Sequence, residues 1–482
     1  MTNETSTNSY KTILKRISAF GGLQIFNIFV NLLRGKFVAI ILGPAGMGVS
    51  SLFLTASTTL QQLGSLGLNL SIVKEVAARQ STDSHAAVMT VSRILILLTS
   101  LLGAVLCAVL APWLSEWTFG NRDYTWGFIL LGGAVGLGIA GTGYQAILQG
   151  VGEIKRLSKA SIVGSMTGLC FGVPLYYFFG TRGIVPAMVI LALSLFLFYW
   201  ISFRKAVKTE KIDFNWSDHS PLVRKLISLG IIFMIGSLVG SATNYVINAI
   251  VRYFGSLDDV GFFQAANSLT NQYIGIVFSA LALDYFPRIS AVSHDSAKLQ
   301  ETVNRQAEIV ILLATPLLLG LITLTPLAIR ILLSAEFLNI IPLIRWLAIG
   351  TLLQAVTFPL GYVFIAKDNK KAYVWVEVVI ANLLWIICSV AGYLWLGLIG
   401  LGVSLVVRTA IDIGISYSLC RHFYGFRYSR RVILTIAGCL LPAAAGFACS
   451  LSTTQTAQAG MWAITITMAC VCLVRLRTLV NK

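Results

Sequence analysis

The feature that most constrains this chain is a series of apolar runs, each long enough to cross a bilayer. Only 11% of its 482 residues are charged and 56% are hydrophobic, whereas a soluble domain carries about 25% charged residues. A chain of this composition cannot cover a water-facing surface of its own size. This excludes a soluble enzyme, a disordered regulator and a secreted disulfide scaffold. The predicted fold class is an all-α integral membrane protein.

A helix that crosses the membrane needs about 20 apolar residues, and fourteen runs of the sequence qualify. Two pairs of runs, which meet at Gly43-Pro44 and at Thr181-Arg182, leave so few residues for a loop that we expect helical hairpins there. The predicted spans are 19–43, 45–72, 89–112, 125–149, 160–180, 183–203, 226–254, 258–286, 308–333, 342–366, 374–396, 398–420, 432–451 and 459–474.

The loops alternate in charge along the chain. Every second loop is basic, and the loops between them carry only Arg122 and Arg182. Basic loops face the cytoplasm, so we predict an even number of spans with both termini cytoplasmic. The loops are too short to hold a catalytic domain. The basic residues that mark the predicted cytoplasmic loops and termini are Lys11, Lys15, Arg16, Lys74, Arg79, Lys155, Arg156, Lys159, Arg204, Lys205, Lys208, Lys211, Arg288, Lys298, Arg305, Lys367, Lys370, Lys371, Arg421, Arg427, Arg430, Arg431, Arg475, Arg477 and Lys482.

The net charge of +17 comes from 36 Lys+Arg against 19 Asp+Glu. Nucleic-acid binding needs such residues gathered on one face or arm; here they are spread between apolar runs, which excludes it. The eight cysteines lie in or at the ends of apolar runs without a CxxC pair, and they indicate neither a disulfide framework nor a metal site. The four histidines fall in predicted loops, and the sequence contains no P-loop.

The chain also repeats itself. Lys15-Arg16-Ile17-Ser18 opens the first span and Lys225-Leu226-Ile227-Ser228 opens the seventh, at an offset of 210 residues. Six spans separate the two, so the repeats enter the membrane in the same direction. Parallel repeats place the substrate between two halves that move against each other. We predict an N-terminal six-helix bundle over 1–213, a C-terminal six-helix bundle over 214–425 and an extra helix pair with a cytoplasmic tail over 426–482.

Polar residues follow one face of each of four predicted helices. Gln24, Asn27, Asn31 and Arg34 succeed one another at steps of three, four and three, which places them on one side of a helix. Such stripes join helices in many membrane proteins, and that interpretation stays open. Four stripes in equivalent positions favour a water-filled cavity between the halves. The other stripes comprise Ser51, Thr55, Thr58, Gln62, Ser65 and Asn69; Ser237, Ser241, Asn244, Asn248 and Arg252; and Gln264, Asn267, Asn271 and Gly275.

Arg34 lies near the middle of the first span. A charge there costs about 2.5 to 3.5 kcal/mol on insertion scales, so we expect it to face a wet cavity and to bind an anion; a structural ion pair is the alternative. Lys36 and Arg252 lie nearer the outer surface. Amides and hydroxyls match sugar hydroxyls, and arginine matches phosphate. The predicted substrate-binding residues are Arg34, Gln24, Asn27, Asn31, Lys36, Thr58, Gln62, Asn244, Asn248, Arg252, Asn267 and Asn271.

Few acidic residues lie within the spans. Arg408 and Asp412 are four residues apart in the twelfth span and can pair with each other; the pair is either structural or part of a proton or ion coupling element. Asp284 lies four residues before Arg288 at the end of the eighth span. We expect no cofactor, and the candidate coupling ions are H⁺ and Na⁺. The candidate coupling residues are Arg408, Asp412 and Asp284.

The run Asn31-Leu32-Leu33-Arg34-Gly35-Lys36, followed by Leu42-Gly43-Pro44-Ala45-Gly46-Met47-Gly48, resembles the O-antigen flippase (Wzx-type) branch of the multidrug/oligosaccharidyl-lipid/polysaccharide exporter superfamily. The resemblance implies two six-helix bundles, with helices one, two, seven and eight lining the cavity. It also implies a cargo, an undecaprenyl-pyrophosphate-linked oligosaccharide, moved from the inner to the outer leaflet. Many members of this branch have twelve spans, and fourteen is closer to the peptidoglycan-precursor flippases.

Three alternative functions stay open at this point. Another lipid-precursor flippase would share the architecture. A cation-coupled multidrug exporter of the same superfamily would need an acidic residue in the first polar stripe, which instead has Arg34. A polysaccharide polymerase or ligase would need a large external loop, which the sequence lacks; we therefore predict that the chain is not an enzyme. The expected partners are the lipid-linked glycan, the bilayer and the polysaccharide polymerase and assembly proteins.

Overall fold

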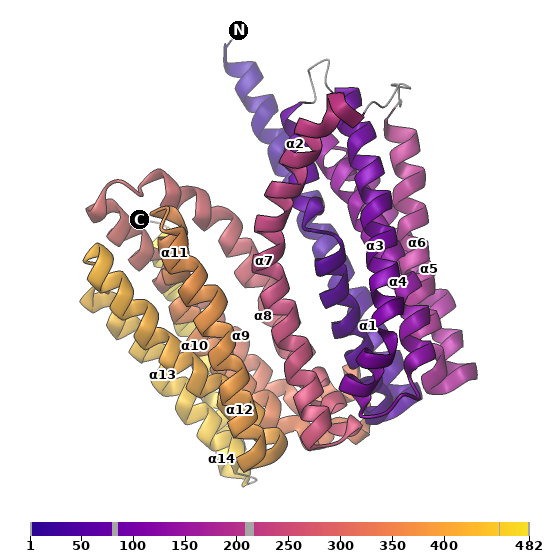
Figure 1. The fold of residues 1–482 in the computed structure, drawn as a ribbon. Coiled ribbons are helices and arrows are strands. Elements are labelled where there is room, and N and C mark those ends of the chain that lie inside the picture. Colours follow the sequence, from indigo (N-terminus) through magenta and orange to yellow (C-terminus); the bar gives the residue numbers. More distant parts are fainter. Residues whose placement is uncertain (1, 80–84, 208–215, 453, 481–482) are drawn as a thin grey trace. The chain divides into compact units, whose positions relative to one another are not determined.

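The computed structural model describes residues 2–79, 85–207, 216–452 and 454–480; the side chains before Phe26 and several in the eighth helix lie outside the description. Within these ranges the secondary structure is helical, as predicted for the fold class. The contacts between residues divide the chain into two compact units, Met1–Val260 and Gly261–Lys482. Figure 1 shows the helices of both units.

The first unit holds seven long or medium helices and one short 3₁₀ turn. α3 packs on α4, α4 on α6, and α5 on α6, while α1 contacts α3, α4, α5 and α7. Exposed leucines on α3, such as Leu97 and Leu101, are 69% and 62% accessible, as expected of a face that meets lipid. The elements are α1 (Thr2–Gly64), α2 (Leu68–Ala78), α3 (His85–Phe119), α4 (Thr125–Val151), α5 (Ile154–Phe179), η1 (Gly180–Gly183), α6 (Ile184–Ala206) and α7 (Trp216–Phe254).

α7 packs mainly on α1, α2 and α3, so the first compact unit includes it. One contact is an ion pair between Lys225 Nζ and the buried Glu75 of α2, at 2.8 Å. A buried carboxylate without a cation would be costly, so this pair helps to hold α7 on the unit. The compact units are defined by packing and the predicted bundles by the internal repeat, so their boundaries need not coincide. The repeat boundary between 213 and 214 stays a prediction.

The second unit is built around α9 and α10. α10 packs on α12, and α13 and α14 pack on each other and on α9. Thr323 of α9 is hydrogen-bonded to Thr465 of α14 at 2.8 Å, and Tyr285 of α8 donates to the Pro359 carbonyl of α10 at 3.0 Å. The elements are α8 (Leu257–Ala291), α9 (Ser296–Leu332), η2 (Ala335–Ile340), α10 (Ile341–Ala366), α11 (Lys370–Tyr373), the π-helix η3 (Val374–Ile380), α12 (Ala381–Tyr424), α13 (Arg430–Leu451) and α14 (Gln455–Val480).

Two glycines break long helices where the sequence predicts loops. Gly43 in α1 has φ +64° and is followed by Pro44, and Gly397 in α12 has φ +58°; only glycine adopts such angles at little cost. The chain reverses at Gly397 in α12. This is shown by a hydrogen bond between residues that are sixteen positions apart: the Ser404 hydroxyl donates to the Cys388 carbonyl at 2.5 Å. Sixteen residues of straight helix would span about 24 Å.

The prediction of one continuous helix over 45–72 is wrong. α1 ends at Gly64 and α2 begins at Leu68. Leu66 and Gly67 between them both have positive φ, +49° and +65°, a conformation that ends a helix. A hydropathy pattern does not show this break, because Leu63, Leu66 and Leu68 keep the run apolar across it.

Ten helical stretches of the described residues are long and apolar enough to cross a membrane. Three of them contain an internal break, at Gly43, at η1 and at Gly397. α8 is not one of the ten. The protein is a multi-pass membrane protein, and the number of fourteen spans stays a prediction.

Candidate functional site

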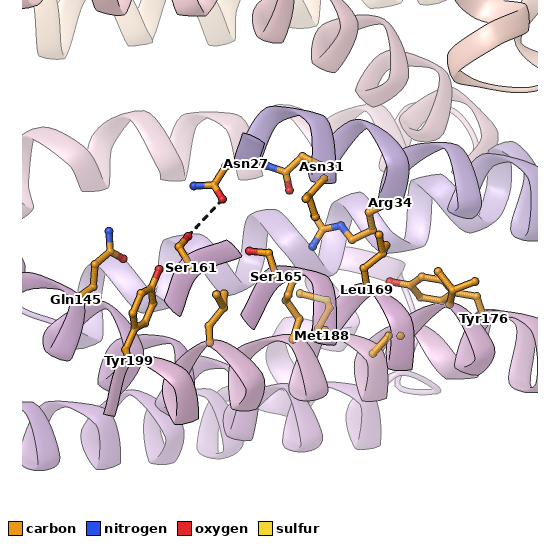
Figure 2. Close-up of a pocket in the computed structure, with 17 residues that line it drawn as sticks. Asn27, Asn31, Arg34, Gln145, Ser161, Ser165, Leu169, Tyr176, Met188 and Tyr199 are labelled. Atoms are coloured by element: carbon orange, nitrogen blue, oxygen red, sulfur yellow. Dashed lines mark hydrogen bonds between the residues drawn. The ribbon is translucent and has the colours of Figure 1, made fainter. Parts of the chain in front are cut away.

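The polar face of α1 lines a cavity inside the first unit. The cavity measures about 250 Å³ and lies between α1, α4, α5 and α6. Asn27, Asn31 and Arg34 reach into it from α1, opposite Ser161 and Ser165 of α5 (Figure 2). The Ser161 hydroxyl donates to the Asn27 side-chain oxygen at 3.3 Å. The steps of three and four residues therefore bring three of the predicted binding residues together.

Arg34 has no carboxylate partner in the part of the chain that the structure describes: none of the ion pairs there includes it. Its side chain is half-buried, and it lines the same cavity as the buried Tyr176 of α5. The guanidinium carries five N–H donors and is always charged. An arginine in this setting can bind an anion that enters the cavity.

Arg34 also borders a second cavity, of about 180 Å³, which lies between α1, α4 and α6. Thr58 and Gln61 come from the part of α1 after the break at Gly43, and Thr142 and Gln145 come from α4. The predicted residue Thr58 thus lies near Arg34. Gln145 and Tyr199 line both cavities, as do the apolar side chains of Met188 and Leu191. The two cavities therefore adjoin each other around the arginine and have a mixed polar and apolar lining.

Two predicted binding residues take part instead in contacts between α1 and α7. The Ser237 hydroxyl donates to the Gln62 side-chain oxygen at 3.0 Å. Asn248 is 2% exposed, and its amide nitrogen donates to the Ser51 hydroxyl at 3.3 Å. These are the contacts that polar stripes make when they join helices. Some residues of the polar stripes therefore join helices, and others line a cavity.

Arg252 lies at the end of α7, where its guanidinium donates to the Phe119 carbonyl of α3 at 3.5 Å. Nearby, Tyr245 of α7 is hydrogen-bonded to Thr118 of α3. Arg252 Nε is buried and has no hydrogen-bond partner among the described residues. In this arrangement Arg252 helps to attach α7 to α3.

The other predicted binding residues whose side chains are described are not among those that line the cavity around Arg34. Asn244 of α7 is exposed and donates to the Gly240 carbonyl of its own helix at 3.1 Å. In α8, Asn271 donates to the Asn267 side chain at 2.6 Å. Lys36 is half-buried in α1. The side chains of Gln24 and Asp284 lie outside the described residues.

The second unit contains a different group of charges. The charge of Arg408 acts on two carboxyl groups, Asp412 of the same helix and Glu377 of η3. Asp412 is 7% exposed and accepts a hydrogen bond from Ser416 at 3.5 Å. Arg408 and Asp412 are close, but no ion pair within 4.0 Å joins them among the described residues. Glu377, in the π-helix η3, belongs to this group although the sequence analysis did not assign it to one.

The sequence analysis did not assign several cavity residues to the site. Ser161, Ser165 and Tyr176 come from α5, Gln145 from α4 and Tyr199 from α6. Gln145 carried a usable signal, because it is an amide within an otherwise apolar run. Periodicity finds the polar face of one helix and does not show which helices oppose it. The predicted cavity between the halves stays a prediction; the described cavity around Arg34 lies within the first unit, and α1, α4, α5 and α6 supply its lining.

The family model for "Polysaccharide biosynthesis protein" matches residues 37–342, more than half of the chain. The chain belongs to this family. Among curated proteins, it is 25% identical over 363 residues to the lipid III flippases of Escherichia coli (strain K12) and Shigella flexneri, a match that covers 73% of this chain and 85% of each relative.

Solved structures with the same fold are also transporters. The lipid II flippase MurJ, in an inward closed conformation, matches with a TM-score of 0.70 and 16% identity over 97% of this family member and 100% of MurJ. An inward-facing multidrug resistance MATE transporter of the MOP superfamily matches with a TM-score of 0.67 and 17% identity, over 83% of this chain and 94% of that one. The predicted superfamily fold is confirmed by these structures, and the named relatives are flippases and transporters rather than enzymes.

Proposed function

We propose that this family member is a flippase that moves an undecaprenyl-pyrophosphate-linked oligosaccharide, an O-antigen or related repeat unit, from the cytoplasmic to the periplasmic leaflet of a bacterial inner membrane. The observation that carries the proposal is Arg34, a half-buried arginine without a carboxylate partner among the described residues, in a cavity where amides and hydroxyls lie beside apolar side chains. A pyrophosphate diester supplies the missing anion. The relatives named as lipid II and lipid III flippases support a lipid-linked cargo.

The side chains around Arg34 suit the first part of such a headgroup. The guanidinium can bind two phosphate oxygens at once, and the amides of Asn27, Asn31 and Gln145 can donate to and accept from sugar hydroxyls. The cavity of about 250 Å³ is smaller than the 300 to 1,000 Å³ typical of drug-sized ligands. It therefore suits the phosphates and an adjoining sugar, and the remaining sugars would lie outside it.

The membrane potential favours export of this cargo. Moving one negative charge out of a cell that is negative inside is worth roughly 2.3 kcal/mol per 100 mV, and a pyrophosphate diester carries about two such charges. Counter-transport of H⁺ or Na⁺ is part of the proposal as an additional driving force. Asp412 and Glu377 of the second unit are the carboxyl groups on which such coupling would act.

The test is a flipping assay with purified protein in liposomes. The cargo is an undecaprenyl-pyrophosphate-linked oligosaccharide with a label on the sugar that a membrane-impermeant reagent destroys only in the outer leaflet. Wild type should equilibrate the label across the bilayer, and Arg34→Ala should not. Arg182→Ala, which removes an exposed arginine in η1, is the matched control and should flip normally. Equal flipping by Arg34→Ala and wild type would overturn the proposal.

A further inference from the structure

Two adjoining cavities lie where α9, α13 and α14 meet in the second unit. They measure about 650 Å³ and 360 Å³, and Glu308 and Arg431 line both. Arg305 and Asn304 border the larger cavity, and Arg475 borders the smaller one. None of these residues belongs to the cavity around Arg34, so this is a separate place in the molecule.

The smaller cavity is built around an anchored arginine. Glu308 is 5% exposed, and its carboxylate accepts from Arg431 Nε at 3.1 Å and from the Thr435 hydroxyl at 3.5 Å. The contact fixes Arg431 through its inner nitrogen. Within the described ranges, the two outer nitrogens of Arg431 have no hydrogen-bond partner, so they can bind a ligand.

A second arginine is held beside the first. Arg475 of α14 donates to the Thr435 hydroxyl at 2.9 Å, and Thr435 in turn contacts Glu308. The Thr435 hydroxyl lies 3.0 Å from the Arg431 carbonyl, to which it donates, and 3.5 Å from the Glu308 carboxylate. One threonine therefore holds Arg475 beside the Arg431–Glu308 pair. The two arginines and one glutamate that line the smaller cavity leave one net positive charge, from +2 and −1, which a phosphodiester would neutralise.

The larger cavity is fixed by the start of α13. The Ser429 backbone N–H donates to the Asn304 side-chain oxygen at 2.7 Å, and the Asn304 amide donates to the Arg427 carbonyl at 3.2 Å. These bonds tie the segment before α13 to α9. The cavities are therefore present before any ligand arrives, which lowers the cost of binding.

The cavities adjoin an apolar outer surface. Leu434 lines the smaller cavity and is 62% exposed, while Leu473 and Val474 of α14 are each 63% exposed. Exposed leucine and valine on a membrane helix meet acyl chains. The residues before α13 and after Val474 carry several arginines, a pattern typical of the cytoplasmic interface. An anion that binds here would have a charged end in the cavity and an apolar end along the helices.

We propose that this place between α9, α13 and α14 binds the headgroup of an anionic phospholipid, such as phosphatidylglycerol or cardiolipin, in the cytoplasmic leaflet. Arg431 and Arg475 contact the phosphodiester, and the acyl chains lie along Leu434 and α14. Basic pockets between membrane helices on this side bind such lipids in other proteins. The site does not depend on the transport function. Free phosphate and the pyrophosphate of a carrier lipid have the same phosphate chemistry, and the test separates them.

The test is native mass spectrometry of the purified protein titrated with one lipid at a time. Phosphatidylglycerol and cardiolipin should bind at least several-fold more tightly than phosphatidylcholine. Arg475→Gln should weaken phosphatidylglycerol binding roughly fivefold or more, as expected from the loss of one charge-assisted hydrogen bond. Arg477→Gln removes an exposed arginine two residues along the same helix, outside the cavity lining, and should bind phosphatidylglycerol like wild type.

Several results would overturn the assignment. One is an equal loss of phosphatidylglycerol affinity in Arg475→Gln and Arg477→Gln. Another is binding of phosphatidylcholine as tight as that of phosphatidylglycerol. A third is tighter binding of inorganic phosphate or undecaprenyl pyrophosphate than of phosphatidylglycerol. If Arg475→Gln fails to fold, the paired variant Arg431→Gln with Glu308→Gln replaces it, because it removes one charge of each sign and leaves no buried carboxylate unpaired. That variant should lose phosphatidylglycerol binding to a similar degree, and unchanged binding would equally contradict the proposal.

Discussion

Arg34 in the first unit and Arg408 in the second are both half-buried arginines in apolar helices, yet their surroundings differ. Arg34 lines two cavities with amides and hydroxyls and has no carboxylate partner among the described residues. Arg408 acts on two carboxyl groups, Glu377 and Asp412. Neither arginine makes an ion pair within 4.0 Å among the described residues. Carboxyl groups near Arg408 can balance its charge, whereas the cavities around Arg34 have no acidic residue in their described lining, so Arg34 is the one available to an anionic ligand.

The largest expected effect separates transport from stability at Arg34. Arg34→Ala should lower the rate of flipping at least tenfold, because a charge-assisted contact with phosphate is worth about 1.5 to 3 kcal/mol. The apparent melting temperature should stay close to that of wild type, because no carboxylate loses its partner. Parallel flipping and thermal unfolding assays check this. A large loss of stability would make Arg34 a structural residue like Arg408.

The opposite result is expected at Arg408. Arg408→Ala should destabilise the protein by about 2 kcal/mol, because the buried carboxyl groups Glu377 and Asp412 lose the positive charge nearby. The measurement is the unfolding free energy in detergent or bicelles. The double variant Arg408→Gln with Asp412→Asn should be less destabilised than Arg408→Ala. If the double variant is no more stable, the two residues do not interact as described.

Asp412→Asn alone tests whether the second unit also couples to ions. It removes one of the two carboxylates near Arg408 and should cost about 1 kcal/mol of stability, with a smaller effect on flipping. Flipping is measured with and without a proton or sodium gradient. Should the variant remain fully stable and lose only its response to the gradient, ion coupling rather than fold stability would be the role of Asp412.

The smallest effect concerns the hydroxyl opposite Asn27. Ser161→Ala removes the donor to the Asn27 side chain and should slow flipping about threefold, the value of one neutral hydrogen bond. Ser158→Ala, the same change three residues earlier in α5, lies outside the cavity lining and should leave the rate unchanged. Equal rates for all three proteins would remove Ser161 and Asn27 from the binding face.

The parts of this structure that depend on local sequence were predictable. The break in α1 at Gly43 and the reversal in α12 at Gly397 follow from glycine and from the ends of apolar runs. The common face of Asn27, Asn31 and Arg34 follows from helical periodicity. The break at Leu66 was missed, because the left-handed conformation of a leucine has no signal in hydropathy.

What could not be predicted is which helix faces which. The polar stripes of α1 and α7 look alike in the sequence, but Asn248 is buried against Ser51 while Asn31 is exposed in a cavity. Equally, Ser161 of α5 became part of the site only because α5 packs on α1. Which polar residues lie between helices and which line the cavity depends on tertiary packing. Helical periodicity in a single sequence does not predict that packing.

The most direct test of the account is the affinity of the purified protein for two cargoes that differ only in charge, the same oligosaccharide on undecaprenyl pyrophosphate and on an uncharged lipid. Wild type should bind the pyrophosphate-linked form roughly tenfold or more tightly, and Arg34→Gln should bind both forms equally. A preference for the charged form that persists in Arg34→Gln would contradict the assignment of Arg34 as the phosphate ligand.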